Sequence, residues 1–427
     1  MKILLFSTLY PNAAQPHHGV FVENRLRHLL AGDGVEARVV APIPWFPSAN
    51  PRFGAYAEFA RAPGAEVRAG IPVVHPRYPV LPKIGMVPAP VLLYLAARAS
   101  VRRLLAEGFD FDLIDAHYIY PDGIAAALLA REFGRPFVMT GRGTDLNLIP
   151  RYRLPRRMIR WAAARADGLI TVCDALAEDL AELGVARARV RVLRNGVDLA
   201  QFSRDPARRA ELRAVHGLDG PVVLSVGHLI ERKGHDLAIR ALVDLPGAHL
   251  LIAGTGPLAR PLKELAESLG VAARVSFLGG VPHAQLKGYY AAADVLVLAS
   301  SREGWPNVLL ESLACGTPVV ATAVDGTPEV VRAEVAGRVV AARTPAAIAA
   351  GLADVLARRA DPAAVRAYAE DFSWDATSAG QRALFAEILA ARSGEGAQGP
   401  AGADWTEPAG RRSSAAARDD TRQVFDA

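Results

Sequence analysis

The stretch DVLVLASSREGWPNVLLE, residues 294–311, carries the signal that decides the fold. Its apolar start, DVLVLAS, is typical of a buried parallel strand, and NVLLE continues into a helical pattern. Pro306 suits the first turn of that helix, and Asn307 suits its start. The polar loop between strand and helix is therefore expected at the carboxyl end of a strand, where α/β proteins place their ligands.

Two glutamates bracket this loop and the first turn of the helix. Free backbone N–H groups at a helix start can hold a phosphate, and here they belong to Asn307, Val308 and Leu309. Glu311 can accept the hydroxyls of a ribose, and Glu303 can accept hydroxyls of a group beyond the phosphates. The spacing suits a nucleoside diphosphate-sugar. The alternative is a solvated loop and a solvated helix face, which the leucines around Glu311 weaken.

The whole chain alternates short apolar runs with longer amphipathic stretches, as doubly wound α/β domains do. Its 427 residues are too many for one core, so two domains are expected. We predict one in residues 1–200, a second in residues 201–370, and a polar, disordered tail in residues 393–427. The proline-rich segment 42–86 is interpreted as a surface excursion with at most one strand, at IPVVH.

The predicted strands are continuous apolar runs, which is typical of sheets buried on both faces. Those of the first domain are KILLFST, ARVVAP, FDLIDAH, PFVMT, GLITVC and RVRVLRN. Those of the second domain are PVVLSVG, HLLIAGTG, RVSFLGG, DVLVLAS and TPVVAT. Two such domains in tandem make a cleft between their strand ends, and ligands are expected there.

Composition excludes several classes of protein. The only cysteines, Cys173 and Cys315, exclude a disulfide framework and a cysteine zinc cluster, and they fit a reducing cytoplasm. No apolar run reaches the length of a membrane span, and KILLFSTLYP is interpreted as a first strand rather than a signal peptide. Residues 1–200 hold 25 basic and 18 acidic side chains, whereas residues 201–427 hold 24 and 26. The first half is therefore the one expected to meet an anionic partner.

A second loop at a predicted strand end is basic. In VGHLIERKGHD, residues 226–236, Arg232 and Lys233 stand just before Gly234 at a predicted helix start. Two cations there can neutralise a diphosphate leaving group. A solvated basic turn is the alternative.

With these motifs in place, the second half resembles the donor-binding domain of the retaining glycosyltransferases of family 4, which have the GT-B fold. The matching pieces cover most of residues 220–391 in the order and spacing of the family. They are VGHLIERKGHDLAIRA, LLIAGTGPL, VSFLGGVPHAQLKGYYAAADVLVLASSREGWPNVLLESLACGTPVVATAVDGTPEVV and FSWDATSAGQRALFAEIL. The resemblance implies two Rossmann-like domains facing across a cleft, with a C-terminal helix, residues 371–392, that packs back on the first domain.

The resemblance also implies roles for residues of the donor side. Glu303 would contact the donor sugar and Glu311 the ribose, while Lys233 and Arg232 would hold the diphosphate. The family usually has an arginine where this sequence has His228, so His228 is a weaker substitute or Arg232 takes over that charge. Gly254 and Val281 would line the nucleotide site. GTG at 254–256 lacks the rest of a dinucleotide fingerprint, which disfavours NAD binding.

The first half resembles the acceptor domain more loosely. Gly19 stands where the family often has two glycines near the phosphates and the acceptor. His117, in DAHYIYPDG, resembles the histidine that contacts the transferring sugar from the acceptor side; a structural histidine is the alternative. Arg142, Thr144 and Asp145, in TGRGTDLN, are candidate acceptor contacts.

Six arginines lie between Arg151 and Arg165, in RYRLPRRMIRWAAAR. Together with the aperiodic apolar segment 79–95, they can seat the first domain on an anionic membrane, so the protein is expected in the cytoplasm or on the inner face of the membrane. A solvated basic face is the alternative. No nucleic-acid recognition motif is present, and we expect no nucleic-acid partner. The histidines lack ligand spacing, so no metal and no cofactor besides the co-substrate are expected.

The sequence thus predicts a retaining glycosyltransferase. It would move a hexose from a nucleoside diphosphate-sugar, UDP-linked by preference, to a hydroxyl of a glycan or lipid-linked acceptor in surface or exopolysaccharide synthesis. Two alternatives stay open: a nucleotide-sugar 2-epimerase, and a catalytically inert subunit that binds sugar nucleotides. Neither the sugar, the acceptor nor the oligomeric state is readable from the sequence.

Overall fold

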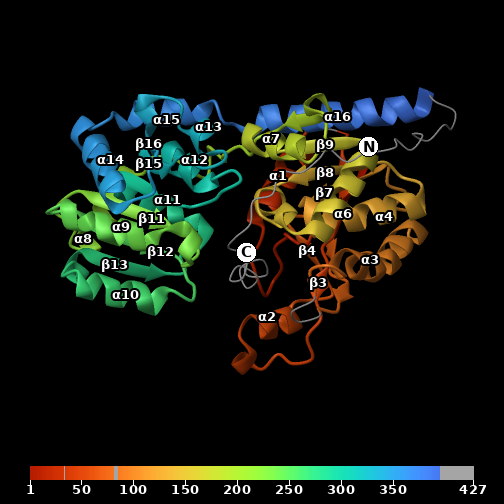
Figure 1. The fold of residues 1–427 in the computed structure, drawn as a ribbon, viewed down its shortest axis with the longest axis horizontal. Helices are drawn as coiled ribbons and strands as arrows, with labels where there is room; N and C mark the ends of the chain where they lie inside the picture. Colours follow the sequence, from red (N-terminus) through yellow and green to blue (C-terminus); the bar gives the residue numbers. More distant parts are fainter. Residues whose placement is uncertain (33, 81–84, 395–427) are drawn as a thin grey trace.

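The computed structural model describes residues 1–32, 34–80 and 85–394, and it consists of two α/β domains side by side (Figure 1). The N-terminal sheet has the strand order β10-β9-β8-β7-β1-β2-β5-β4. All its pairs are parallel except that of β4 with β5. Its strands are β1 (Lys2–Phe6), β2 (Glu36–Val40), β4 (Ala65–Arg68), β5 (Ile71–Val74), β7 (Leu113–His117), β8 (Phe137–Gly141), β9 (Gly168–Thr171) and β10 (Val190–Val192).

Helices cover both faces of this sheet, as the predicted alternation requires. They are α1 (Val20–Leu30), α3 (Ala89–Ala106), α4 (Ile124–Phe133), α5 (Thr144–Asn147), α6 (Arg153–Arg165) and α7 (Asp174–Glu182). Phe6 at the end of β1 pairs with Ala116 of β7 and with Val40 of β2. The loops after these strands therefore emerge at one edge of the sheet.

The C-terminal domain contains a fully parallel sheet with the order β13-β12-β11-β14-β15-β16. Its strands are β11 (Val222–Val226), β12 (His249–Ala253), β13 (Val275–Gly279), β14 (Val295–Leu298), β15 (Val319–Thr322) and β16 (Gly337–Val340). Its helices are α8 (Pro206–Val215), α9 (His235–Ala241), α10 (Ala259–Ser268), α11 (His283–Ala292), α12 (Asn307–Ala314), α13 (Thr327–Val330), α14 (Pro345–Arg358) and α15 (Pro362–Glu370).

The last helix, α16 (Trp374–Gly394), leaves the C-terminal domain and lies along the N-terminal one (Figure 1). Its Leu384, Phe385 and Ile388 belong to the same buried cluster as Leu26 of α1 and Ile170 of β9. The apolar face of α16 thus completes a core that the first domain began, and the predicted GT-B architecture is confirmed.

Four sequence-based expectations need correction. Segment 42–86 has more than one strand: it holds β3 (Ile43–Pro44), α2 (Ala55–Arg61), β4, β5 and β6 (Arg77–Tyr78). Elements this short produce no readable period. The predicted elements also include neither α8 nor β16.

Segment 79–95 is not aperiodic throughout, because its residues 89–95 form the first turns of α3, while residues 81–84 lie outside the described part. The predicted tail also begins two residues too early, since α16 extends to Gly394, and residues 395–427 lie outside the described part. Among the described residues, no helix is both long and apolar enough to cross a bilayer.

Candidate active site between the two domains

Glu303 lies on the loop after β14 and is 8% exposed. Its Oε1 accepts from Lys233 Nζ at 2.6 Å and from Ser300 Oγ at 2.6 Å. Arg232 Nη1 lies 3.6 Å from the other carboxylate oxygen. Burial raises the pKa of the Glu303 carboxyl, but the charges of Lys233 and Arg232 outweigh burial and hold the pKa below its ordinary value. The structure therefore brings the predicted sugar contact and the predicted phosphate cations into one cluster.

Glu311 lies in α12 and is also 8% exposed. Its carboxylate accepts from Tyr290 Oη at 2.7 Å and lies 2.9 Å from His283 Nε2. Burial lowers the pKa of His283, but the hydrogen bond and charge of Glu311 raise it above its ordinary value overall. Glu311 was predicted as a projecting ribose contact, and the structure holds it between two α11 side chains that the sequence did not single out.

A cavity of about 200 Å³ opens beside Glu311, between the domains. His283, Asn307 and Val308 line it from the C-terminal domain. His17, Val20, Phe21 and Asn24 line it from the N-terminal domain. Glu311 thus faces an interdomain pocket rather than bulk solvent.

The start of α12 differs from the prediction of free N–H groups. The N–H of Asn307 donates to the carbonyl of Trp305, and that of Leu309 donates to the carbonyl of Pro306. The turn forced by Pro306 thus engages two of the three predicted donors locally. Val308 remains at the pocket wall.

The remaining donor-side residues lie on loops after β11, β12 and β13. Gly254 has φ +155°, and a Cβ there would collide with the carbonyl oxygen of Gly227. A Cβ on Gly227 would in turn lie 3.5 Å from Lys233 Cδ. Gly254 is therefore needed for two loops to pack against each other beside Lys233. His228 is exposed on the first of these loops, and Val281 is half-buried after β13.

On the opposite side of the cleft, His117 ends β7 and is only 1% exposed. Its Nε2 lies 3.1 Å from Asp115 Oδ2, and its Nδ1 contacts Arg142 Nη2. Burial lowers the pKa of His117 to about 4, so the imidazole is neutral at physiological pH. Both ring nitrogens are used within the protein, which differs from the expected contact with sugar hydroxyls.

The three predicted acceptor contacts lie on the loop after β8 and differ in their burial and contacts. Asp145 is fully buried, and its carboxylate accepts from the N–H groups of Ile119 (2.7 Å), Arg142 (3.0 Å) and Gly143 (2.8 Å). Its predicted role as an acceptor contact is therefore wrong: it shapes the loop. Arg142 is 8% exposed, and its guanidinium carbon lies 5.3 Å from the ring centroid of Phe21. Thr144 is half-buried at the start of α5.

Gly19 begins α1 with φ +66°, and a Cβ there would collide with the carbonyl of Leu9. Only glycine fits this position without strain. Gly19 thus sets the direction of α1, whose Val20 and Phe21 line the interdomain pocket.

The two domains touch directly at their strand ends. Trp305 Nε1 donates to the carbonyl of Asn195 at 2.9 Å, and Asn147 Nδ2 donates to the carbonyl of Glu303 at 3.2 Å. A Cβ on Gly304 would collide with the carbonyl oxygen of Arg142. The cleft is therefore closed here. Its contacts use Gly304 and Trp305 of the opening stretch. They also use Asn147 and Asn195, which end TGRGTDLN and RVRVLRN and were not predicted as site residues.

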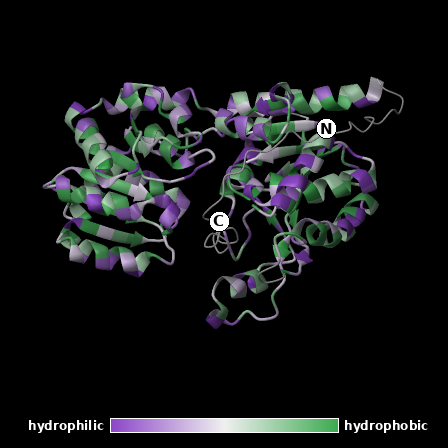
Figure 2. Cartoon of the chain, viewed as in Figure 1, coloured by the Kyte–Doolittle hydropathy of each residue, from purple (hydrophilic) through white to green (hydrophobic). Residues whose placement is uncertain are grey.

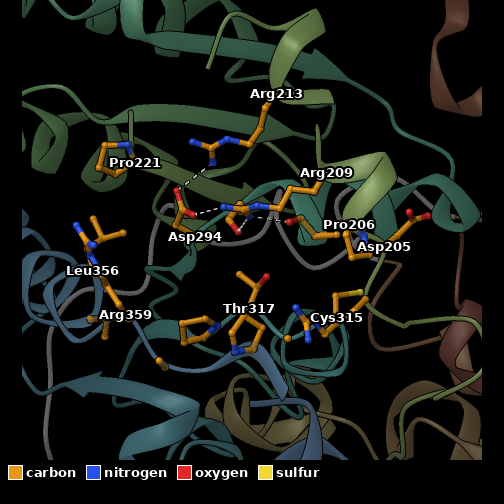
Figure 3. A pocket seen from close by; sticks show the side chains of 18 of the residues that line it. Asp205, Pro206, Arg209, Arg213, Pro221, Asp294, Cys315, Thr317, Leu356 and Arg359 are labelled. Carbon is orange, nitrogen blue, oxygen red and sulfur yellow. Dashed lines mark hydrogen bonds and ion pairs between the residues drawn. The ribbon is translucent and has the colours of Figure 1, made fainter. Parts of the chain in front are cut away.

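A larger cavity, about 530 Å³, lies at the opposite edge of the C-terminal sheet (Figure 3). Its Arg209 donates to Asp294 at 2.5 Å and to the carbonyl of Ala293 at 2.8 Å, and Arg213 donates to Asp294 at 3.1 Å. These cations already have partners, and none of the predicted site residues lines this cavity. The candidate active site is therefore the interdomain one. In the described part of the chain, no group of three or more His, Cys, Asp or Glu residues could hold a metal ion.

Comparison with known proteins agrees with this arrangement. Residues 208–372 match the family model "Glycosyl transferases group 1", and residues 19–201 match "Glycosyltransferase Family 4". A Bacillus subtilis protein named as a teichuronic acid biosynthesis glycosyltransferase, TuaC, is 32% identical over 334 residues, which are 76% of this chain and 82% of that protein.

A second relative, from Mycolicibacterium smegmatis, is named a GDP-mannose-dependent α-(1-6)-phosphatidylinositol monomannoside mannosyltransferase. It is 33% identical over 329 residues, 73% of this chain and 83% of its own length. Among solved structures, the sucrose-phosphate synthase of Thermosynechococcus elongatus superimposes with a TM-score of 0.76 at 22% identity, covering 92% of this chain and all of that one. The fold of the two chains is therefore the same.

Proposed function

Because the chain belongs to the group 1 glycosyltransferases and has their GT-B fold, we propose that it transfers a hexose from a nucleoside diphosphate-sugar to an acceptor hydroxyl with retention of configuration. The observation that carries the proposal is the cluster of Glu303, Lys233 and Arg232, which faces the loop of Arg142 across a closed cleft. Such a cluster combines a sugar-binding carboxylate with cations suited to a leaving diphosphate.

In the proposed reaction, the diphosphate of the donor takes over Lys233 and Arg232 from Glu303. The two cations stabilise the negative charge that grows on the leaving phosphate as the glycosidic bond breaks. Glu303, released from its ion pairs, positions the sugar and supports positive charge at the anomeric carbon. The leaving phosphate receives the proton of the acceptor hydroxyl, which enters on the same face. Closure through Gly304 and Trp305 excludes water and suppresses hydrolysis.

Glu311 and the pocket beside it serve the nucleoside in this proposal. The ribose hydroxyls replace His283 or Tyr290 as partners of the carboxylate, since each of these donors occupies one of its oxygens. A UDP-sugar is the first donor to test. GDP-mannose is the second, because the name of the mycobacterial relative specifies it.

We place the enzyme in the cytoplasm, on the inner face of the membrane, with a glycan or lipid-linked acceptor in surface polysaccharide synthesis. Arg151, Arg153, Arg156 and Arg157 form no ion pair with any described residue, so their charges are available to anionic lipids. Figure 2 shows the hydrophilic colour of α6 on the front of the N-terminal domain. The exposed Leu154 on α6, and Val91 and Leu95 on α3, add apolar contacts.

The test is a donor screen by thermal shift, with UDP-, GDP- and ADP-sugars, with and without EDTA. Wild type, Glu311→Ala and the control Glu264→Ala, an exposed residue of α10, are compared. A ligand that binds the folded state raises the melting temperature by mass action. A shift with one sugar nucleotide, unaffected by EDTA, lost in Glu311→Ala and kept in Glu264→Ala, supports the proposal. No shift with any donor on folded protein would overturn it. A 2-epimerised sugar nucleotide formed without acceptor would favour the epimerase.

A further inference from the structure

Gln381 of α16 is a buried polar residue that the proposed chemistry does not use. It is 1% exposed and lies on the helix that follows the donor domain in sequence. Its Nε2 donates to Asp115 Oδ2 at 2.7 Å, and its Oε1 accepts from Arg25 Nε at 2.9 Å. Arg25 and Asp115 are themselves 1% and 0% exposed. The side-chain amide therefore bridges a buried cation on α1 and a buried carboxylate on β7.

Asp115 transmits this contact to His117. The same oxygen, Asp115 Oδ2, lies 3.1 Å from His117 Nε2. On the other side of the ring, Nδ1 meets the guanidinium of Arg142, whose Nη1 also donates to Asn195 Oδ1 at 3.0 Å. A guanidinium has only donors, so Nδ1 has to be the acceptor and Nε2 carries the ring proton. One tautomer and one orientation of His117 follow.

We propose that Gln381 is a positioning residue for glycosyl transfer: by holding Asp115, it fixes the tautomer and orientation of His117 beside Arg142 at the acceptor side of the cleft. The acceptor domain therefore receives one of its orienting groups from the chain segment that follows the donor domain. Buried hydrogen-bond partners of this kind orient the groups in front of them. The activity part of this inference rests on the proposed function.

Two variants test the side-chain amide of Gln381. Gln381→Glu keeps the oxygen that faces Arg25 but replaces the donor to Asp115 by a carboxylate oxygen. Gln381→Leu removes both contacts. The control is Leu384→Ala, one turn further along α16, which loosens the packing of the helix without touching Asp115. In both Gln381 variants we expect kcat to fall on the order of 10- to 100-fold while the donor KM changes little. His117 contacts Arg142, whose backbone carbonyl packs against Gly304 in the closed cleft, so a displaced ring disturbs the geometry that the transition state requires. Leu384→Ala is expected to melt earlier and keep its kcat.

A spectroscopic readout separates positioning from mere stability. Histidine-selective ¹⁵N NMR of the full chain, assigned with His117→Gln, is expected to show His117 with Nε2 protonated and Nδ1 unprotonated, and this pattern is expected to change in Gln381→Glu. Unchanged His117 resonances in Gln381→Glu would overturn the inference, as would a kcat loss no larger than that of Leu384→Ala. If the wild type binds no sugar nucleotide, the proposed function fails, and the His117 resonances alone decide this inference.

Discussion

Lys233 Nζ lies 2.6 Å from Glu303 Oε1, and the two residues lie on loops that follow different strands of the donor domain. The two side chains are 15% and 9% exposed, so each neutralises the other in a partly desolvated place. In water such a pair contributes little, but here removal of one partner leaves an uncompensated charge. In the proposed reaction a bound diphosphate replaces Glu303 as the partner of Lys233, and before the donor binds the ion pair holds the cation in place.

Glu303→Gln is expected to separate binding from chemistry. The change frees Lys233 and Arg232 from a competing carboxylate, so UDP alone, or GDP if that is the donor base, should bind at least as tightly as in wild type. Transfer should fall by about 100-fold or more, because the support for positive charge at the sugar is lost. Calorimetric titration with the nucleotide and an initial-rate assay check this, with Glu264→Gln as the surface control. Weaker nucleotide binding with unchanged kcat would contradict it.

Acid should destabilise the protein through His117. Its pKa is lowered to about 4 in the folded state, whereas an unfolded histidine titrates near 6.5. Between these values the unfolded chain binds more protons, so stability falls as pH falls from about 6.5 to about 4. The loss attributable to this group is about 3 kcal/mol.

The measurement is urea unfolding of wild type and His117→Gln at several pH values in that window. As pH falls through that window, the free energy of unfolding of wild type should decrease more than that of His117→Gln. Parallel curves would show that His117 does not resist protonation in the folded state.

Gly304→Ala should open the cleft without unfolding either domain. The added methyl group collides with the carbonyl of Arg142, which belongs to the other domain, so the strain is relieved by separating the domains. We expect a larger radius of gyration in small-angle X-ray scattering, a nearly unchanged melting temperature and reduced kcat. Gly64→Ala, where a Cβ meets nothing within 4 Å, is the matched control. If Gly304→Ala were unfolded, the contact between Gly304 and Arg142 would belong to a folding core and not to a separable domain interface.

Replacement of Arg153, Arg156 and Arg157 by glutamine should weaken binding to vesicles of phosphatidylglycerol and phosphatidylcholine. Each basic residue near an anionic surface contributes about 1 kcal/mol, so three changes reduce the partition coefficient on the order of 100-fold at low salt. Co-sedimentation measures the effect. A triple change of Arg260, Arg338 and Arg359 in the other domain keeps the charge loss equal and should leave binding intact. Equal losses in both variants would indicate non-specific attraction.

Local sequence predicted the strands of both sheets well where they are continuous apolar runs, as in KILLFST, PFVMT and DVLVLAS. A buried parallel strand needs such a run, because both of its faces are covered. Between residues 43 and 78 only β5, at IPVVH, was predicted, and β3, β4 and β6 were missed, since two to four residues cannot display a period. On the donor side, the spacing of Glu303 and Glu311 and the basic turn at Lys233 could be interpreted from local chemistry alone.

The sequence by itself therefore determined two α/β domains and the loops that carry the charged residues of the donor side, because these depend on neighbours a few positions apart. Only the tertiary structure decided what the candidate residues of both domains touch. Asp145 turns inward to three backbone N–H groups, and Lys233 meets Glu303. His117 is oriented by Arg142 and, through Asp115, by Gln381, 266 positions further along the chain. Contacts at such separations arise from how the two domains and α16 pack, and no local pattern encodes them.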